Sequence, residues 1–354
     1  ILSMISSNIG HAAVQGLIPD IVPEEMYGRF SGVKAFFELP APLIFVSFVI
    51  TKLVEVQNIW GALLVLCGVV LVSTLIAMFA PEVPNSKSTN KVDWKPILRL
   101  LAMTIVFTLV ILGAGAAVKA VNTRAEGITN INGLVVTAVG GVLGMLVAVV
   151  LGVWTSLRIS LGKNGGDDKT SFTWWVINRL AFLVGSTNIA SFVLYYLQER
   201  FDNLSGSLAA GPTALLVMLV GIAILVSSIP AGWLADKFGR KQVCAFSGGL
   251  AAFGMALVLV SPGMTMLYVG GLLVGAAIGF FYSASWALGT SLVPKEEAGR
   301  YLGIQNLASA GAGAIGAYIG GPIGDGVGFT VLMAIFGLLF LVSSIALLGI
   351  REKP

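Results

Sequence analysis

The chain has 354 residues, of which 56% are hydrophobic and 11% are charged, and its mean hydropathy is +0.93. Soluble globular domains carry roughly 25% charged residues, so this composition excludes a water-soluble fold and indicates an all-α polytopic membrane protein. The net charge of +4 comes from basic residues scattered over short segments, which argues against a nucleic-acid-binding protein.

Eleven apolar segments follow one another along the chain, each near the roughly 20 residues that a helix needs to cross a bilayer. They do not alternate between apolar and polar residues, as the strands of a membrane barrel do. The first begins at Ile1 inside an apolar run, and we expect the protein to extend upstream of it. The predicted spans are 1–19, 30–51, 59–80, 97–121, 131–156, 172–197, 211–230, 243–260, 265–289, 302–321 and 329–350.

Lysine and arginine predict the orientation of these spans, because cytoplasmic loops carry an excess of basic residues. The segment 231–242 reads "AGWLADKFGRKQ". If it is cytoplasmic and the sides alternate from there, 16 of the 21 basic residues, Lys34 among them, fall on the cytoplasmic side, four fall outside and Arg179 lies within a span. The C-terminus is then cytoplasmic, and the expected location is the plasma (cell inner) membrane.

Two segments predicted to be cytoplasmic repeat each other. "IVPEEMYGRFSG" at 21–32 and "LVPKEEAGRYLG" at 292–303 align at a constant offset of 271, which pairs Arg29 with Arg300. Many transporters are built from internal repeats, with the substrate site at the interface between the repeats. The alternative is a chance similarity between two helix-start loops.

The run "GWLADKFGRK" resembles the G-x-L-A-D-x-x-G-R-K loop of the major facilitator superfamily, which follows the second helix of each six-helix half in that family. The Pro-x-x-x-x-Gly-Arg segments resemble the family's loops after helices four and ten. The span at 172–197 is similar to its seventh helix, and the "YYL" run in it resembles the sugar and glycoside–cation symporter branches.

This resemblance implies a bundle of two pseudo-symmetric halves. Residues 1–80 would form a partial N-terminal half (helices four to six), and residues 172–354 a complete C-terminal half (helices seven to twelve). Residues 81–171 would form a linker with an extra two-helix hairpin, which departs from the plain family pattern and whose default role is packing or lipid contact. The repeat offset places the counterpart of Asp236 before residue 1, so helices one to three are expected upstream.

The resemblance further implies that the 231–242 loop stabilises one face of an alternating-access cycle. Asp236 is expected at the positive N-terminal end of the helix that starts near Arg29. Gly232 and Gly239 allow close helix approach and a positive φ. Lys237, Arg240 and Lys241 are expected at the anionic inner membrane surface. A loop that is only a positive-inside anchor is the alternative, but it does not account for the acid between two glycines.

Three helical stripes of polar and aromatic residues are the candidate lining of a substrate cavity. The residues of each stripe lie on one helical face, and polar side chains inside a membrane usually face a bundle interior or a cavity. Interhelical hydrogen bonding without a ligand is the alternative for each single residue. The stripes are Asn8, His11 and Gln15 in the first span, Asn188, Ser191 and Tyr195 in the 172–197 span, and Tyr282, Ser285, Trp286 and Gly289 in the 265–289 span.

Two ionisable residues fall inside spans. Glu38 lies eight residues past Phe30, roughly 12 Å along a helix, and is too deep to reach the membrane surface. It joins the cavity candidates. Arg179 follows Trp174 and Trp175, which are expected to be interface anchors, so its side chain is expected to reach the cytoplasmic surface in a structural role.

His11 and Glu38 are the candidates for proton coupling. An imidazole changes charge near neutral pH, and the resemblance implies that both residues lie on cavity-lining helices. The alternative is that His11 is a neutral hydrogen-bonding residue and that Glu38 pairs with a cation of the upstream helices.

The sequence thus predicts a secondary active transporter of a small organic solute, sugar-like by preference, with a proton or another cation as a further partner besides the lipid bilayer. Drug efflux is an alternative, disfavoured because the glycine-proline run at 316–324 resembles a drug-antiporter signature that belongs on helix five, where this chain has "AFFELPAP". A non-transporting membrane sensor is another. No enzymatic activity, cofactor or metal site is expected, since there is no phosphate-binding loop or catalytic triad and His11 is the single histidine.

Overall fold

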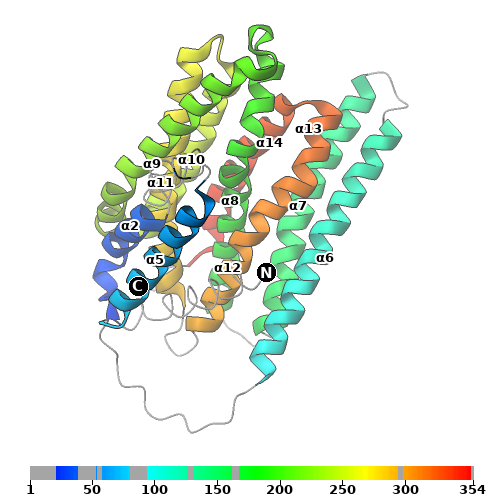
Figure 1. Ribbon diagram of the computed structural model, residues 1–354. Helices are drawn as coiled ribbons and strands as arrows, with labels where there is room; N and C mark the ends of the chain where they lie inside the picture. Colours follow the sequence, from blue (N-terminus) through cyan, green and yellow to red (C-terminus); the bar gives the residue numbers. More distant parts are fainter. Residues whose placement is uncertain are drawn as a thin grey trace.

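The computed structural model describes residues 21–38, 53, 58–79, 94–125, 131–161, 167–293 and 298–351. Every regular element within these ranges is helical, and eight of the helices are long and apolar enough to cross a membrane. Successive helices run up and down across the bundle (Figure 1). The protein is therefore an integral membrane protein of the all-α class that its composition predicts.

The first 80 residues contribute two described helices, α2 (Tyr27–Glu38), which follows the 3-10 turn η1 (Glu24–Met26), and α5 (Ile59–Ala77). The extra hairpin consists of α6 (Trp94–Ala125) and α7 (Ile131–Leu161). The remaining elements, in chain order, are α8 (Asp167–Arg200), η3 (Asp202–Leu204), η4 (Gly206–Ala209), α9 (Ala210–Phe238), α10 (Arg240–Val260), α11 (Met264–Leu292), α12 (Ala298–Ile315), the π-helical turn η6 (Gly316–Gly320), α13 (Gly321–Val327), α14 (Phe329–Ala346) and η7 (Leu347–Gly349). The predicted span 1–19 and the second part of the span 30–51 lie outside the described residues.

The segment 231–242 is not the loop that the sequence predicts. Helix α9 continues through Pro230 to Phe238, and α10 begins at Arg240, so a single residue separates the two helices. That residue is Gly239, whose φ of +100° suits glycine and no other residue type well. The loop prediction was wrong because charged side chains also suit a helix that projects beyond the bilayer.

The span predicted at 302–321 is also not a single regular helix. Helix α12 ends at Ile315, widens into the π-helical turn Gly316–Gly320 and continues as α13. Pro322 has no backbone N–H and its ring clashes with the carbonyl four residues earlier in a regular α-helix, so the wider turn accommodates it. The backbone carbonyl oxygen of Pro322 accepts a hydrogen bond from the Asn122 side chain of α6.

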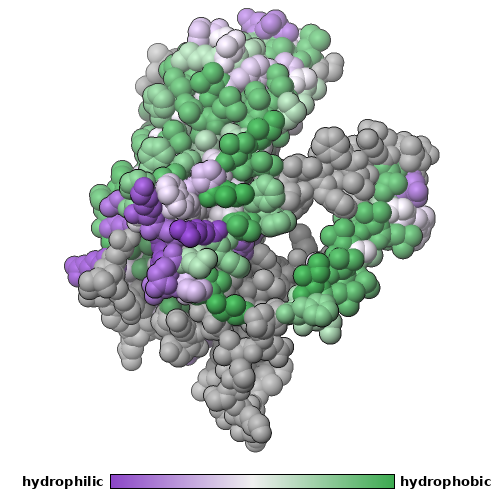
Figure 2. Space-filling view, turned by 90° about the vertical axis from the view of Figure 1, so that its left-hand side faces the viewer, coloured by the Kyte–Doolittle hydropathy of each residue, from purple (hydrophilic) through white to green (hydrophobic). Residues whose placement is uncertain are grey.

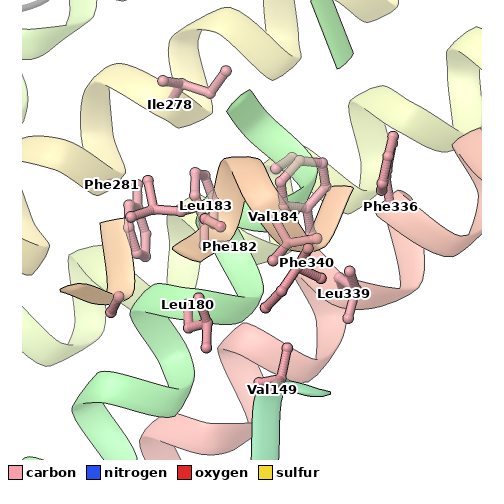
Figure 3. Packing of buried hydrophobic residues seen from close by; sticks show 14 of the residues in the cluster. Val149, Leu180, Phe182, Leu183, Val184, Ile278, Phe281, Phe336, Leu339 and Phe340 are labelled. Atoms are coloured by element: carbon pink, nitrogen blue, oxygen red, sulfur yellow. The ribbon is translucent and has the colours of Figure 1, made fainter. Parts of the chain in front are cut away.

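The centre of the bundle is α8, which packs between α11 and α14. The ring of Phe182 stacks on Phe281 of α11 with 3.7 Å between centroids and also lies 4.9 Å from the ring of Phe340 of α14 (Figure 3). All three side chains are fully buried. Because α8 is held on both sides by large rings, it is the rigid element against which the polar residues described below are placed.

The hairpin α6–α7 packs against α12, η6 and α13 and forms the edge of the bundle opposite α9 (Figure 1). The ring of Phe107 on α6 lies against Gly152 of α7 and Gly311 of α12, at positions where a Cβ atom would collide with it. The outer faces of both helices carry exposed apolar side chains such as Leu109 and Leu143. The hairpin therefore has one packed face and one face suited to lipid.

The outer surface of the bundle is largely apolar. Figure 2 shows a broad band of hydrophobic residues on the side formed by the first helices of the C-terminal half, with hydrophilic residues gathered toward its two ends. Helices α9 and α10 carry large exposed apolar side chains such as Val226, Phe246 and Phe253. An apolar band with polar ends is the surface that a bilayer solvates.

Candidate functional site

The carboxylate of Asp236 lies at the N-terminus of α2, more than 200 residues away in the chain. Its Oδ1 accepts a hydrogen bond from the backbone N–H of Gly28 at 2.8 Å, and its Oδ2 accepts one from the N–H of Arg29 at 2.8 Å. The first N–H groups of a helix have no partner inside the helix, so the acid satisfies two of them and meets the positive end of the helix dipole. The Arg29 Nε lies 3.9 Å from the same carboxylate.

Glycines bring α2 and α9 close enough for this contact. A Cβ atom on Gly28 would collide with the Asp236 carboxylate and with the carbonyl oxygen of Gly232, and a Cβ atom on Gly232 would collide with the carbonyl oxygen of Gly28. Gly32, one turn further along α2, faces Ser228 and Gly232 at a similar distance. Two glycines four residues apart form the small-residue surface that lets membrane helices approach closely.

The cations around this junction contact protein. Arg240 donates a hydrogen bond to the Glu24 carbonyl, lies 4.0 Å from its carboxylate and stacks over the ring of Tyr27. Lys241 donates to the carbonyl oxygen of Ile350 at 2.6 Å. Arg240 thereby ties α10 to the start of α2, and Lys241 ties it to the end of the C-terminal helix. Their location at the inner membrane surface stays a prediction.

A second group of charged and aromatic residues lies further along α2, inside the bundle. The Nζ atom of Lys34 is 3.2 Å from the Glu38 carboxylate, one helical turn on. It also lies over the indole ring of Trp286 on α11, 2.9 Å from the ring centroid. The sequence analysis counted Lys34 among the cytoplasmic cations, but its side chain is only 14% exposed because α2 packs against α11 at this point.

Arg179 of α8 completes this group. Its side chain is 2% exposed, donates from Nη1 to the Ser285 hydroxyl at 3.2 Å and lies within 6 Å of the rings of Trp175, Tyr282 and Trp286. The expectation that Arg179 reaches the cytoplasmic surface is therefore wrong. Inside the bundle, the guanidinium contacts these aromatic rings of α8 and α11 and the Ser285 hydroxyl in place of water.

Trp175 was also misjudged as an interface anchor. It is fully buried, and its indole N–H donates to the backbone carbonyl oxygen of Ser285 at 2.9 Å. Its ring fills the space above Gly289, where a Cβ atom would collide with it. Trp175 therefore sets the distance between α8 and α11, while its neighbour Trp174 is 39% exposed.

We call Lys34, Glu38, Arg179, Tyr282, Ser285 and Trp286 the α2–α8–α11 cluster. Four of its members are cavity candidates from the sequence, and the structure brings them together from two helices. Lys34 and Arg179 are the members that the sequence analysis missed as site residues. The spacing of Lys34 and Glu38, four residues apart on one helix, was the available signal for the first.

The stripe on α8 divides into two kinds of residue. Asn188 is buried and donates from Nδ2 to the backbone carbonyl oxygens of Val184 and of Ala312 on α12. It therefore makes an interhelical hydrogen bond, which was the alternative to lining a cavity. Ser191 and Tyr195 are exposed, and the Tyr195 ring stacks on Phe329 with 5.1 Å between centroids. Neither of these two contacts the cluster in any contact that the structure describes.

Several predicted site residues cannot be placed. Asn8, His11 and Gln15 lie outside the described residues. The backbone of Arg300 lies in the first turn of α12, but its side chain is outside the described part. Among the described residues there is no group of three histidine, cysteine or acidic side chains that could hold a metal ion.

Comparison with known proteins identifies the family. A model of the Major Facilitator Superfamily matches residues 175–354. The chain is 30% identical over 162 residues to the minor myo-inositol transporter IolF of Bacillus subtilis and 34% identical over 140 residues to the multi-drug resistance efflux pump PmrA of Streptococcus pneumoniae. It is 28% identical over 123 residues to myo-inositol transporter 2 of Schizosaccharomyces pombe.

These alignments cover 44%, 37% and 33% of this chain, respectively. The chain covers 35% of the length of IolF and of PmrA, and 22% of the yeast protein. The family match includes the described helices from most of α8 to α14, and with them Asp236 and the part of the cluster on α8 and α11. With the family model matching half of its residues, the chain belongs to the Major Facilitator Superfamily.

Proposed function

We propose that the intact protein is a secondary active transporter that moves a small polyhydroxylated solute across the plasma membrane by alternating access. The observation that carries this proposal is the α2–α8–α11 cluster. Three charged side chains and two aromatic ones meet inside an otherwise apolar bundle. Charged side chains within a membrane are costly, and they usually mark the path of a substrate or ion.

The chemistry of the cluster suits a solute with several hydroxyl groups. Hydroxyl groups both donate and accept hydrogen bonds, and the cluster supplies a carboxylate acceptor in Glu38 and donors in Lys34 and Arg179. The rings of Tyr282 and Trp286 supply flat apolar surface beside these groups. Small-molecule sites typically combine aromatic walls with a few placed polar groups.

The similarity to proteins named as inositol transporters supports this class of substrate. Inositol is a ring that carries only hydroxyl groups, and two of the relatives above have a myo-inositol transporter name. The similarity to IolF extends over 162 residues and is therefore not limited to a short motif. A sugar-like solute, the preference drawn from the polar stripes, falls in the same chemical class.

The Asp236 junction supports the alternating-access mechanism. It ties α9, in the C-terminal half, to α2, which precedes the hairpin, through a contact that depends on one carboxylate. A contact of this kind can open as a unit when the two parts rock against each other. We propose that it closes the cytoplasmic end of the cavity and breaks when that end opens.

Uptake by the intact protein in proteoliposomes tests the proposal. Vesicles preloaded with unlabelled myo-inositol should accumulate radiolabelled myo-inositol from outside by counterflow, and empty vesicles should not. Arg179→Gln should abolish the exchange while the protein still elutes as a single folded species. Equal counter-transport by the parent and the Arg179 variant would remove the cluster from the transport path.

Drug efflux is a second candidate, favoured by the 34% identity to PmrA over 140 residues. The same vesicles separate the two. A cationic dye that moves against its gradient when a proton gradient is imposed, with no exchange of myo-inositol, would replace the polyol proposal. Exchange of myo-inositol without dye movement would exclude efflux of that dye class.

A further inference from the structure

The α2–α8–α11 cluster holds more basic groups and hydrogen-bond donors than the described residues around it satisfy. Two basic side chains, Lys34 and Arg179, lie over the same indole ring of Trp286. The single carboxylate among the cluster residues, Glu38, lies 3.2 Å from Lys34. The cluster therefore has two basic groups and one acidic group.

Two of its donors have no partner among the residues that the structure describes. The Nε–H of Arg179 and the indole N–H of Trp286 make no hydrogen bond to any of these residues, although both side chains are 2% exposed. Arg179 uses Nη1 to reach the Ser285 hydroxyl, which leaves the Nε edge of its fork free to bind something else. A buried N–H group without a partner is destabilising, so such groups in a folded protein call for a ligand or another specific explanation.

The acceptor that satisfies these groups together is an anion. The planar guanidinium of an arginine matches the two oxygens of a carboxylate. A lysine ammonium close to the same ring also attracts the carboxylate and places a weaker demand on its orientation. A neutral hydroxyl group accepts hydrogen bonds but leaves the excess charge uncompensated. A carboxylate compensates one positive charge and accepts from more than one donor.

We propose that Arg179, Lys34 and the Trp286 indole N–H form a carboxylate-binding subsite, so that the preferred solute is a sugar acid. The proposal rests on the polyhydroxylated class of substrate proposed above and narrows it to a solute with one acidic group. The hydroxyl groups of such a solute face Glu38 and Tyr282, and its carboxylate faces Arg179. Arg179 is then the residue that determines specificity between acidic and neutral sugars.

Binding to the intact, detergent-solubilised protein tests the subsite without requiring transport. Isothermal titration with D-gluconate and D-glucuronate is compared with their neutral analogues D-glucose and myo-inositol. The acids should bind at least about tenfold more tightly than the neutral compounds, since a neutral ligand leaves charged donors unpaired. Equal or tighter binding of the neutral compounds would overturn the proposal.

Two conservative variants assign the effect to the named groups. Arg179→Lys keeps the charge but loses the fork, and Trp286→Phe keeps an aromatic ring beside the cations but loses the N–H donor. Each should weaken binding of the acids about tenfold or more and reduce the preference for the acids over the neutral compounds. Arg158→Lys is the matched control, because Arg158 also lies over a tryptophan, Trp154, at 4.9 Å but on the exposed face of the hairpin.

The possible outcomes separate this inference from the transport proposal. Binding of the acids that depends on Arg179, without uptake into vesicles, would support the subsite and count against transport. Exchange of myo-inositol without measurable binding of either acid would leave the transport proposal standing and overturn the subsite. Binding of the acids that is unchanged in Arg179→Lys and Trp286→Phe would place the carboxylate elsewhere and overturn it as well.

Discussion

Individual polar residues in this protein perform two different tasks inside the apolar bundle. Asp236 and Glu199 both cap the N-terminus of a distant helix: Asp236 accepts from Gly28 and Arg29, and Glu199 accepts from the N–H groups of Phe329 and Thr330. Glu199 joins α8 to α14, two helices that the family match includes together, whereas Asp236 reaches α2, which lies outside that match. The same chemistry therefore has different consequences for a conformational cycle.

Replacement of Asp236 by Asn is expected to reduce transport about fivefold or more, because losing the charge at a helix N-terminus costs about 1 kcal/mol of the contact that closes the bundle. Initial uptake rates in proteoliposomes measure it. Glu199→Gln is the matched control and should lower thermal stability slightly while leaving the rate nearly unchanged. If Asp236→Asn transports like the parent protein, the junction does not gate transport and Asp236 is only a structural cap.

If Glu38 and His11 carry the coupled proton, replacing either residue should abolish one transport activity and preserve another. Glu38→Gln and His11→Gln should each abolish accumulation driven by a pH gradient yet preserve downhill exchange of solute, because only the driven process needs a group that takes up and releases a proton. Both activities are measured on the same vesicles. A parallel loss of both activities, or no loss of either, would remove these two residues from the proton path.

Pairs of helices are positioned by glycines as much as by large side chains. The α2–α9 crossing depends on Gly28, Gly32 and Gly232, and the hairpin sits on α12 through Gly311 and the ring of Phe107. Close approach of backbones gives dispersion contacts that lipid cannot replace. Large aromatic rings of α8, α11 and α14 fill the space between these three helices (Figure 3).

Gly232→Ala is expected to separate α2 from α9 and to weaken their contact by about 1–3 kcal/mol, the usual range for overpacking. The added methyl group would collide with the Gly28 carbonyl, so the Asp236 hydrogen bonds must lengthen. Faster amide exchange at residues 27–32, measured by mass spectrometry, would report this. Gly249→Ala in α10 is the control, because a Cβ atom there meets nothing within 4 Å, and it should leave exchange at α2 unchanged.

The whole molecule carries the charge asymmetry of a membrane protein with a defined orientation. The up-and-down course of the helices (Figure 1) places the N-termini of α2 and α12 at the same end as Gly239, the end that the positive-inside rule predicts to be cytoplasmic. We propose that this end is cytoplasmic.

The division of the chain into residues 1–80, 81–171 and 172–354 is likewise a prediction. Of these parts the structure describes α2 and α5, the α6–α7 hairpin, and the helices from α8 to α14.

Cysteine labelling in whole cells tests the orientation. Cysteines introduced at Glu25 and Glu296 should resist a membrane-impermeant thiol reagent added outside, while one at Asp202 in η3 should react. Cys67 is exposed and should first be replaced by Ser, whereas Cys244 is buried and can stay. Reaction at Glu25 or Glu296 from the outside would invert the topology proposed here.

The sequence alone determined the features that depend on composition and local pattern. Long apolar runs predict helices regardless of what they contact, because an unpaired backbone in lipid is too costly. The described helices from α5 to α14 match their predicted spans to within a few residues, apart from α12 and the C-terminal end of α9. The resemblance of the 231–242 segment to the family's loop also indicated the neighbour of Asp236, the helix that starts near Arg29. Polar periodicity selected Tyr282, Ser285 and Trp286 as cavity candidates, and the depth of its charge within a span selected Glu38.

Only the tertiary structure decided which of these polar residues meet and what surrounds them. The sequence predicts that Arg179 lies near the membrane surface. In the structure a hydroxyl group of α11 accepts a hydrogen bond from its guanidinium, which also lies beside three aromatic rings, one from α8 and two from α11. The sequence predicts that Lys34 is a cytoplasmic cation, but α2 packs against α11 and its ammonium group lies over the ring of Trp286. The sequence predicts that Asn188 lines a cavity, but its amide donates a hydrogen bond to a backbone carbonyl oxygen of α12. Such pairings join residues up to about 250 positions apart, and local periodicity carries no information about the partner that a helix face will meet.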